Sequence, residues 1–253
     1  MNPPTIVTWI WRGERTYDLS HAALLAEGLK RFMTTPYRLV ILSEDAGTVP
    51  HAEVMPIPAG AQSVAGVRTP ENRNFPSSYR RLWLFSEEAR TLGETLLLVD
   101  VDVVVTGDWS HLFAHQPEAQ FMGWKPGQLW GNIEARVGGG VWRLTAGTRK
   151  RVWEDFIANP SMAIATARQC GYRGSDQAWI SFCLAADAPI WPKSAGIRSV
   201  RDFNRDKRGL VVPSIPPGTC MVHFNGTAKP WQAETQKYHR WLGPYLPGGA
   251  TPT

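Results

Sequence analysis

An eleven-residue run in the middle of the chain, residues 95–105, places the strongest constraint on the fold. Nine of its residues are leucine, valine or threonine, which is typical of a strand buried on both faces of a mainly parallel sheet. Asp100 and Asp102 interrupt the run. Because an unpaired carboxylate costs several kcal/mol inside a core, we expect the run to emerge from the sheet near Asp100.

The two acids are separated by one residue, and side chains two positions apart on an extended segment share a face. Asp100 and Asp102 can therefore aim at one point. Paired carboxylates suit Mn²⁺ or Mg²⁺, and open α/β sheets bind ligands at the carboxyl edge of their strands. A pair of acids that caps a turn before Gly107 and Asp108 is the alternative that these residues leave open.

The composition is that of a folded protein. With 253 residues, of which 43% are hydrophobic, the chain is expected to form one domain, or one domain with a small appendage. No run approaches the ~20 apolar residues of a membrane span, and the first residues lack the pattern of a signal peptide. Three widely spaced cysteines, Cys170, Cys183 and Cys220, are expected to be reduced, buried thiols in a cytoplasmic protein.

The order of apolar segments predicts an α/β fold. Strands are predicted at 5–11, 37–42, 52–57, 95–105, 120–124, 141–144 and 218–224. Helices are predicted around Leu25, Leu29 and Phe32 and at 79–90, 109–113, 146–158 and 174–183. Residues 191–218 are predicted to be irregular, and a C-terminal helix is predicted to place Tyr238 and Trp241 on one face.

Three further segments hold candidate functional residues. The glycines at 138–140 would let the backbone pass close to a ligand, although a flexible connector fits them equally well. Asp176 and Gln177 follow a serine at a predicted helix start, where ordinary capping is the simpler explanation. His223 and Lys229 could grip a metal-bound diphosphate across a tight turn, and a core histidine with a surface lysine is the alternative.

These segments together resemble a known enzyme family. The string His-x-x-Gly-x-x-Lys-Pro-Trp occupies 223–231, with Asp-x-Asp at 100–102 upstream. This pair of motifs is similar to the retaining GT-A glycosyltransferases of family 8, which include bacterial galactosyltransferases and glycogenin-like enzymes. Further matches, in the family's order, are Tyr79-Arg80-Arg81-Leu82, Gly139-Gly140-Val141 and Asp176-Gln177. Gly138 replaces an asparagine of the family pattern, and Ala178 replaces an acid that some members carry.

The resemblance implies both a fold and an activity. It implies a single GT-A (Rossmann-like) catalytic domain at 1–231, with a mixed, mainly parallel central sheet flanked by helices, and a C-terminal helix and tail at 232–253. It also implies metal-dependent transfer, with retention, of a sugar from a nucleotide-diphosphate sugar, first of all a UDP-sugar. The acceptor would be a hydroxyl of a saccharide, a lipid or a protein.

The resemblance assigns roles to particular residues. Asp100, Asp102 and His223 would hold Mn²⁺, with Mg²⁺ as the alternative. Asp176 would fix hydroxyls of the transferred sugar, and Gln177 would lie beneath its anomeric carbon. The residues expected to contact the donor or to stabilise its leaving group are Arg81, Asp100, Gly139, Gly140, His223, Gly226 and Lys229.

Other functions are compatible with the same residues. The net charge of +5 and the twelve tryptophans fit an acceptor that is a modified base in DNA. Hydrolysis of the sugar nucleotide, nucleotidyl transfer, and a non-catalytic carbohydrate- or nucleotide-binding module are further possibilities. The sequence has no Gly-x-x-x-x-Gly-Lys loop, no Gly-x-Ser-x-Gly elbow and no zinc-type Cys/His spacing, so it gives no support to a kinase, a serine hydrolase or a zinc enzyme.

Overall fold

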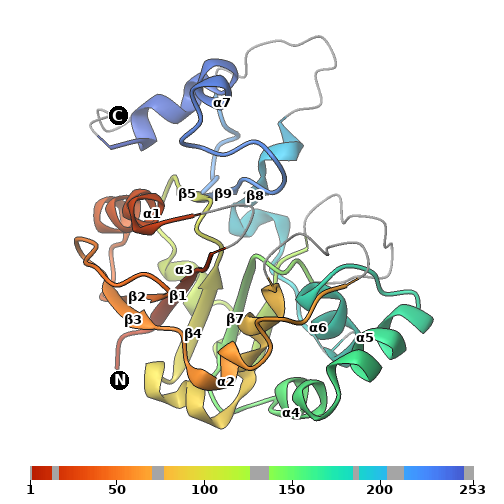
Figure 1. Cartoon of the computed structure of the whole chain (residues 1–253). Helices are drawn as coiled ribbons and strands as arrows, with labels where there is room; N and C mark the ends of the chain where they lie inside the picture. Colours follow the sequence, from red (N-terminus) through yellow and green to blue (C-terminus); the bar gives the residue numbers. More distant parts are fainter. Residues whose placement is uncertain are drawn as a thin grey trace.

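Six strands form the central sheet of the protein, in the order β3-β2-β1-β4-β7-β6. The structure is a computed structural model, and it describes residues 2–12, 17–69, 77–125, 137–184, 188–203 and 214–247. The predicted tail at 248–253 lies outside the described residues. Figure 1 shows the sheet at the centre of the molecule, below the C-terminal segment.

The sheet is mixed and mainly parallel, as the sequence predicts. Strands β3, β2, β1 and β4 run parallel to one another, whereas β7 runs antiparallel to both of its neighbours, β4 and β6. The bounds are β1 Thr5–Ile10, β2 Arg38–Ser43, β3 Glu53–Pro56, β4 Thr95–Val99, β6 Phe121–Gly123 and β7 Val141–Thr145. The predicted α/β class is therefore confirmed.

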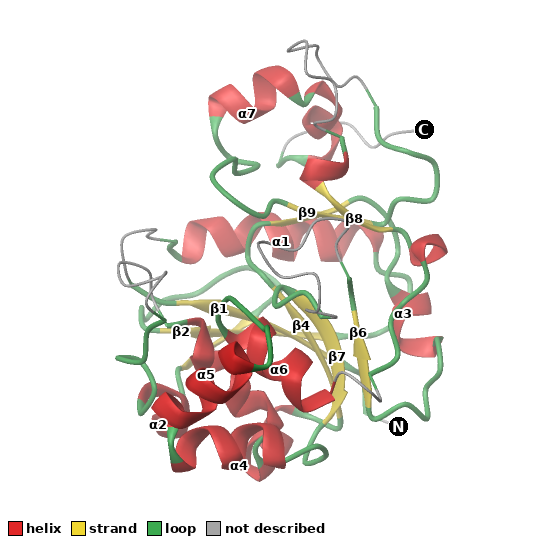
Figure 2. Cartoon of the chain, turned by 90° about the vertical axis from the view of Figure 1, so that its right-hand side faces the viewer, coloured by secondary structure: helices red, strands yellow, loops and turns green. Residues whose placement is uncertain are grey.

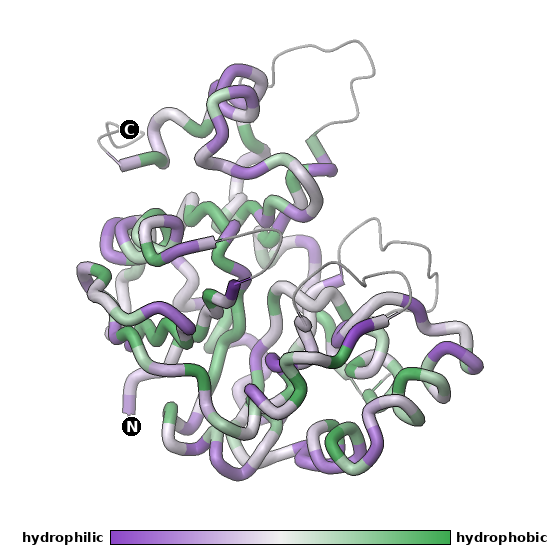
Figure 3. Tube along the Cα trace, viewed as in Figure 1, coloured by the Kyte–Doolittle hydropathy of each residue, from purple (hydrophilic) through white to green (hydrophobic). Residues whose placement is uncertain are grey.

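Helices cover both faces of this sheet, because apolar side chains point from β4 to both faces in alternation. Leu96 and Leu98 belong to one apolar cluster, whereas Leu97 and Val99 belong to another. On the first side lie α2 (Ala59–Gln62), α4 (Arg151–Ala158), α5 (Pro160–Gln169) and α6 (Asp176–Leu184), which Figure 2 shows in front of the sheet. On the second side lie α1 (Leu19–Phe32) and α3 (Ser110–Ala114). Figure 3 shows the hydrophobic residues concentrated along the central strands.

The run 95–105 forms two strands in two sheets, not the single strand that was predicted. After β4 the chain turns at 100–102 and continues as β5 (Val103–Val105) in a three-stranded sheet of order β5-β9-β8. The remaining strands of this small sheet are β8 (Ile197–Ser199) and β9 (Met221–His223). The prediction that the run leaves the main sheet near Asp100 is confirmed, and the turn spares both acids a position inside a strand.

The C-terminal segment packs on the small sheet. It consists of α7 (Ala233–Tyr238) and the 3₁₀ helix η6 (Arg240–Tyr245), seen at the top of Figure 1. Trp241 is 4% exposed and packs with the apolar side chains of β9, whereas Tyr238 is 41% exposed. The predicted shared face is wrong, because α7 ends at Tyr238 and the chain changes direction before Trp241.

Several predicted helices differ in form. The predicted helix at 79–90 is two 3₁₀ helices, η2 (Ser78–Phe85) and η3 (Glu87–Leu92), separated by an extended Ser86. The predicted helix at 146–158 begins only at Arg151. Helix α5, which was not predicted, follows at once because the side chain of Asn159 accepts a hydrogen bond from Met162 N at 3.0 Å and Pro160 occupies the first turn.

Two more expectations need correction. The segment 191–218 is not wholly irregular, since it contains η4 (Lys193–Ala195), β8 and η5 (Val200–Asp202). All three cysteines are free, but Cys170 is exposed, and only Cys220 is fully buried. Within the described residues, no helix combines the length and the apolar character that crossing a bilayer requires.

Candidate active site

Strand register brings the ends of β4 and β9 together. Asp100 follows β4, and its backbone N–H donates to the carbonyl of Gly140 at 2.9 Å. In the antiparallel β5–β9 ladder, Val103 pairs with His223, so Asp102 lies beside the end of β9. The Phe224 N–H closes this corner by donating to the Asp102 carbonyl at 3.0 Å. The position of His223 beside the two acids is thus fixed by backbone hydrogen bonds.

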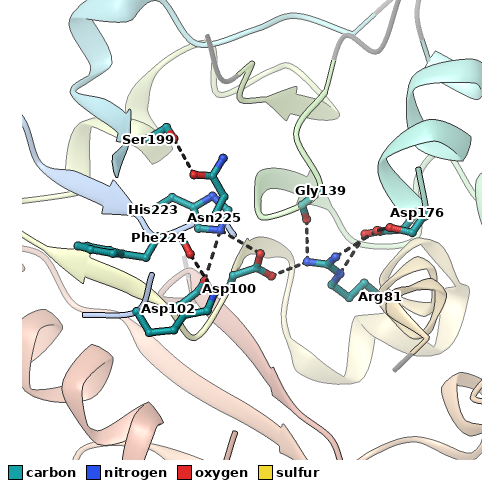
Figure 4. A network of polar contacts seen from close by, with 11 residues as sticks. Arg81, Asp100, Asp102, Gly139, Asp176, Ser199, His223, Phe224 and Asn225 are labelled. Carbon is teal, nitrogen blue, oxygen red and sulfur yellow. Dashed lines mark hydrogen bonds and ion pairs between the residues drawn. The ribbon is translucent and has the colours of Figure 1, made fainter. Parts of the chain in front are cut away.

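The two acids and the imidazole form a compact cluster, shown in Figure 4. His223 Nε2 is 3.1 Å from Asp100 Oδ2 and 3.4 Å from Asp102 Oδ1. One ligand atom of each residue lies within 4.8 Å of the other two. The acids converge through the turn at 100–102 and not along one face of an extended strand, but the expected meeting point exists.

The cluster has the properties that a divalent cation site needs. Asp102 Oδ1 is buried and has no hydrogen-bond partner among the described residues, which leaves a lone pair for a ligand. A Cβ atom at Gly140 would lie 2.5 Å from Asp100 Oδ2 and 2.5 Å from His223 Cε1, so only glycine leaves room there. Two carboxylates and one imidazole form a donor set that fits Mn²⁺, and the three residues therefore fit the predicted metal site.

In the protein without a metal ion, the acids of the cluster are stabilised by the positive charges of neighbouring side chains. Burial by itself would lower the pKa of His223, but the close contact with Asp100 and Asp102 and the negative charge of both acids raise this pKa to about 9. Burial by itself would raise the pKa of each acid, but the charge of Arg81 acts on Asp100, and His223 and Lys229 act on Asp102. The net effect lowers both carboxyl pKa values, so both acids are ionised at neutral pH.

Arg81 links the acids to α6. From the buried face of η2, its Nη1 donates to Asp100 and to the Gly139 carbonyl, the latter at 3.0 Å. Its Nη2 donates to Asp176 Oδ1 at 3.1 Å, and its Nε lies 2.9 Å from Asp176 Oδ2. Figure 4 shows this guanidinium between the two carboxylates. Burial raises the pKa of Asp176, which is fully buried, and the neighbouring Arg81 opposes that rise.

Lys229 is buried and paired with Asp102. Its Nζ donates to the Asp102 carboxylate and to the Phe224 carbonyl, the latter at 3.0 Å. The same Nζ lies 5.6 Å from the centre of the Tyr17 ring. In this structure the ammonium therefore neutralises an acid of the cluster, and its predicted contact with phosphate is a proposal.

Two predicted residues lie at the margin of the network. Gln177 is half-buried in the first turn of α6, and its Nε2 would be 2.8 Å from a Cβ at Gly174, so the amide folds back over the preceding loop. Gly226 has φ +104°, a left-handed conformation that favours glycine in the turn between His223 and Lys229. Neither contact tests the role that the sequence resemblance implies.

Three neighbours of the site were not predicted from the sequence. Tyr17 lies under the Lys229 ammonium, and Trp124 meets the His223 ring edge-on at 5.5 Å between centroids. Arg201 lies against the turn at Gly226. Tyr17 precedes a predicted helix cap, and Trp124 ends a predicted strand, so both had positional signals. Arg201 had none, because its segment was predicted to be irregular.

The comparisons with known proteins identify the fold. No protein-family model matches the chain, and no curated protein matches it. Among solved structures, the chain is similar to the galactosyltransferase LgtC in complex with donor and acceptor sugar analogs (14% identity, TM-score 0.63, 94% of this chain and 95% of that chain). It is also similar to mouse xyloside xylosyltransferase 1 in its apo form (13%, 0.58, 88% and 98%). A third similar structure is the glycosyltransferase GlyE of Streptococcus pneumoniae TIGR4 (13%, 0.56, 92% and 57%).

The chain has the GT-A fold of these glycosyltransferases. At this level of identity the likeness establishes the fold, and it agrees with the resemblance found in the sequence motifs. The Asp100–Asp102–His223 cluster lies at the carboxyl edge of β4, where open α/β sheets place their ligands.

Proposed function

We propose that this protein is a metal-dependent retaining glycosyltransferase that moves a sugar from a nucleotide-diphosphate sugar, first of all a UDP-sugar, to an acceptor hydroxyl. The observation that carries the proposal is the convergence of Asp100, Asp102 and His223 at the carboxyl end of β4 in a GT-A fold. A binding module without activity would have no need to keep a buried, charged and metal-competent cluster, because each buried charge is costly.

Asp100, Asp102 and His223 would hold Mn²⁺ or Mg²⁺. When bound, the cation would supply neutralisation of the donor diphosphate and of the charge that develops on the leaving group. Lys229, which follows the turn after β9, contacts the Asp102 carboxylate through its ammonium, so the ammonium is close enough to exchange that carboxylate for a phosphate oxygen. Arg81 donates hydrogen bonds to Asp176 and to the Gly139 carbonyl, and it thereby fixes the positions of both groups next to the cluster.

Asp176 and Gln177 would face the transferred sugar. The Asp176 carboxylate lies against Gly139, where a Cβ would be 3.2 Å from Asp176 Oδ2, so glycine at this position lets the carboxylate approach the backbone closely. We assign Asp176 to the sugar hydroxyls. It is not assigned as a nucleophile, because it is fully buried and paired with Arg81.

The chemistry of Gln177 supports attack from the same face of the sugar. Its amide is neutral and a poor nucleophile. The acceptor oxygen would bond to the anomeric carbon while the bond from that carbon to the phosphate oxygen breaks, with retention of configuration. The proton of the acceptor hydroxyl would pass to an oxygen of the departing diphosphate, which balances the reaction.

The test is a panel of nucleotide sugars assayed with Mn²⁺, with and without candidate acceptors, with the products identified. We expect transfer or slow donor hydrolysis with one nucleotide class. Asp102→Asn and His223→Ala should each lower the rate by about 100-fold or more, because each removes a metal ligand. Asp155→Asn, at an exposed acid on α4, is the matched control and should keep full activity.

Circular dichroism should show that the three variants keep the fold of the parent. Full activity of Asp102→Asn or His223→Ala in metal-free buffer would contradict the proposal. Formation of a nucleotidyl product, with the phosphate linkage retained on the sugar, would replace glycosyl transfer by nucleotidyl transfer.

We also propose that the protein works in the cytoplasm. Support comes from its free cysteines, which are typical of a reducing compartment. Fractionation of source cells with an antibody to this chain tests the proposal, and recovery outside the cytoplasm would contradict it.

A further inference from the structure

Arg201 is a cationic side chain beside the candidate site that the proposed function does not use. It lies in η5, directly after β8, and is half-buried. In the parallel β8–β9 ladder, Ser199 pairs with His223. The residues after Ser199 therefore run beside the residues after His223, and this register carries Arg201 to the turn that leads to Lys229.

Hydrogen bonds hold this segment in place. Ser199 Oγ donates to Asn225 Oδ1 at 2.7 Å, a contact that Figure 4 shows, and it accepts from the Arg201 N–H at 3.2 Å. The Asp202 carboxylate accepts from the Ser199 N–H at 3.1 Å and so completes a capping box. The backbone that carries Arg201 is thus fixed directly to the turn after His223.

The guanidinium lies against Gly226. A Cβ at Gly226 would be 3.0 Å from Arg201 Nη2 and 3.8 Å from both its Cζ and its Nε. Any side chain at this position would push the guanidinium away, and φ +104° also favours glycine. In the part of the chain that the structure describes, Arg201 makes no ion pair. Its charge therefore remains available to an anionic ligand.

The charge balance of the site leaves a place for one more cation. Asp100, Asp102 and Asp176 face Arg81 and Lys229, which leaves one negative charge when His223 is neutral as a metal ligand. A dication changes this to one positive charge, and the diphosphate of a nucleotide sugar carries two negative charges. One additional cation would bring the loaded site to neutrality, which low-dielectric surroundings favour.

We propose that Arg201 binds the diphosphate of the donor, together with Lys229, and so distinguishes a nucleoside diphosphate from a monophosphate. The proposal rests on the proposed function. A guanidinium suits this task because its fork of N–H donors matches two phosphate oxygens, whereas the lysine supplies a point charge. Gly226 would let the guanidinium and the phosphate approach the same stretch of backbone.

The experiment compares the affinities of UDP and UMP in saturating Mn²⁺ by titration calorimetry, with GDP and GMP as a second pair. Arg201→Gln should weaken UDP binding by about 10- to 50-fold, as expected for loss of charged hydrogen bonds, and should change UMP binding by less than about twofold. The UDP affinity of Arg201→Lys should lie between those of the parent and of Arg201→Gln, because lysine keeps the positive charge but lacks the paired N–H donors of the guanidinium.

Arg198→Gln is the matched control. Arg198 lies on β8 next to Ser199, and because side chains alternate along a strand it points away from the face on which Ser199 contacts Asn225. The Arg198→Gln substitution removes one positive charge, as Arg201→Gln does, and we expect it to change UDP affinity by less than about twofold at physiological salt. Unfolding temperatures of all variants exclude a general loss of structure.

Each contrary outcome overturns a distinct statement. If the parent protein binds UDP with Mn²⁺ but Arg201→Gln binds it equally well, the role of Arg201 is wrong and the proposed function stands. Equal loss of UDP and UMP, or an effect confined to the KM of a negatively charged acceptor, also overturns the role. If the parent binds neither UDP nor GDP with Mn²⁺, the proposed donor class is wrong, and the role of Arg201 is wrong with it.

Discussion

Lys229 and Arg81 neutralise the same carboxylates that a divalent cation would use. Lys229 contacts Asp102, and Arg81 contacts Asp100. A metal ion and these side chains therefore compete, because a dication and two side-chain cations bring four positive charges around two acids, and these charges repel one another. Binding of a diphosphate would relieve this competition by giving the ammonium a second anionic partner. Metal and diphosphate should consequently bind with positive coupling.

Removal of the Lys229 charge tests this competition. We expect Lys229→Gln to tighten the binding of Mn²⁺ alone by about tenfold, because it removes a cation that holds Asp102. The same variant should weaken UDP binding and abolish transfer. Mn²⁺ affinity can be measured by electron paramagnetic resonance without nucleotide. Lys237→Gln, at an exposed lysine on α7, is the control, and weaker Mn²⁺ binding in Lys229→Gln would refute the competition.

Thiol chemistry gives a second test at the scale of single residues. Burial raises the pKa of both Cys183 and Cys220 to about 12, whereas Cys170 is exposed at the end of α5. Because the thiolate is the reactive form, Cys170 should react first with a disulfide reagent at pH ~8. Mass spectrometry of the labelled peptides identifies the site. Rapid labelling of Cys220 in the folded protein would show that the small sheet opens.

At the scale of elements, the pattern of apolar residues predicted where strands lie, but it did not predict how the strands pair. The three leucines at 96–98 and Val99 identify a buried strand from the sequence, and Asp100 correctly indicates its end. The division into β4 and β5 could not be predicted, because valines continue on both sides of Asp102 and strand pairing depends on residues far along the chain. The same limit hid β8, whose three residues gain their structure from β9.

In the candidate site, too, residue types could be predicted from the sequence, whereas contacts that depend on packing could not. The residue types at Asp100, Asp102 and His223 predicted a metal site before their distances were known. The pairing of Arg81 with Asp176 was not predicted, since it depends on how η2 packs against α6. Arg201 was missed entirely, because a strand of three residues has too short a pattern for its position to be inferred.

Acid should weaken the packing of the C-terminal elements. Burial lowers the pKa of His239, whose Nδ1 accepts a hydrogen bond from Trp241 Nε1 at 3.2 Å. Between the lowered folded pKa and the ordinary value of 6.5, the unfolded chain binds more protons at His239. The contribution to stability is therefore complete above the unfolded value and is lost as the pH falls through it towards the folded pKa.

The measurement is the free energy of unfolding of the parent and of His239→Gln from about pH 7 to about pH 5. Glutamine does not titrate, so the parent should lose more stability than the variant over this range. Parallel pH profiles would show that the pKa of His239 is the same in the folded and the unfolded chain, which contradicts a pKa lowered by burial.

At the scale of the whole molecule, the C-terminal segment supports the strand that carries His223. Trp241 packs in the same cluster as Val222 of β9, Phe224 directly after β9 and Leu24 of α1. The predicted division into a catalytic domain at 1–231 and a C-terminal helix and tail stays a prediction. If this division is correct, the C-terminal segment should unfold independently of the rest of the chain; if it is not, the two should unfold together.

Trp241→Ala distinguishes these cases. If the molecule unfolds as one cooperative unit, the loss of this buried ring should lower the free energy of unfolding by about 3–5 kcal/mol, measured by urea denaturation. It should also weaken Mn²⁺ binding, because β9 would hold His223 less rigidly. The matched control is Tyr238→Ala, whose side chain is 41% exposed and whose effect should stay within about 0.5 kcal/mol. An unchanged main transition, preceded by an early transition of the C-terminal segment alone, would instead show that residues 232–253 are an independent appendage and that the metal cluster does not depend on them.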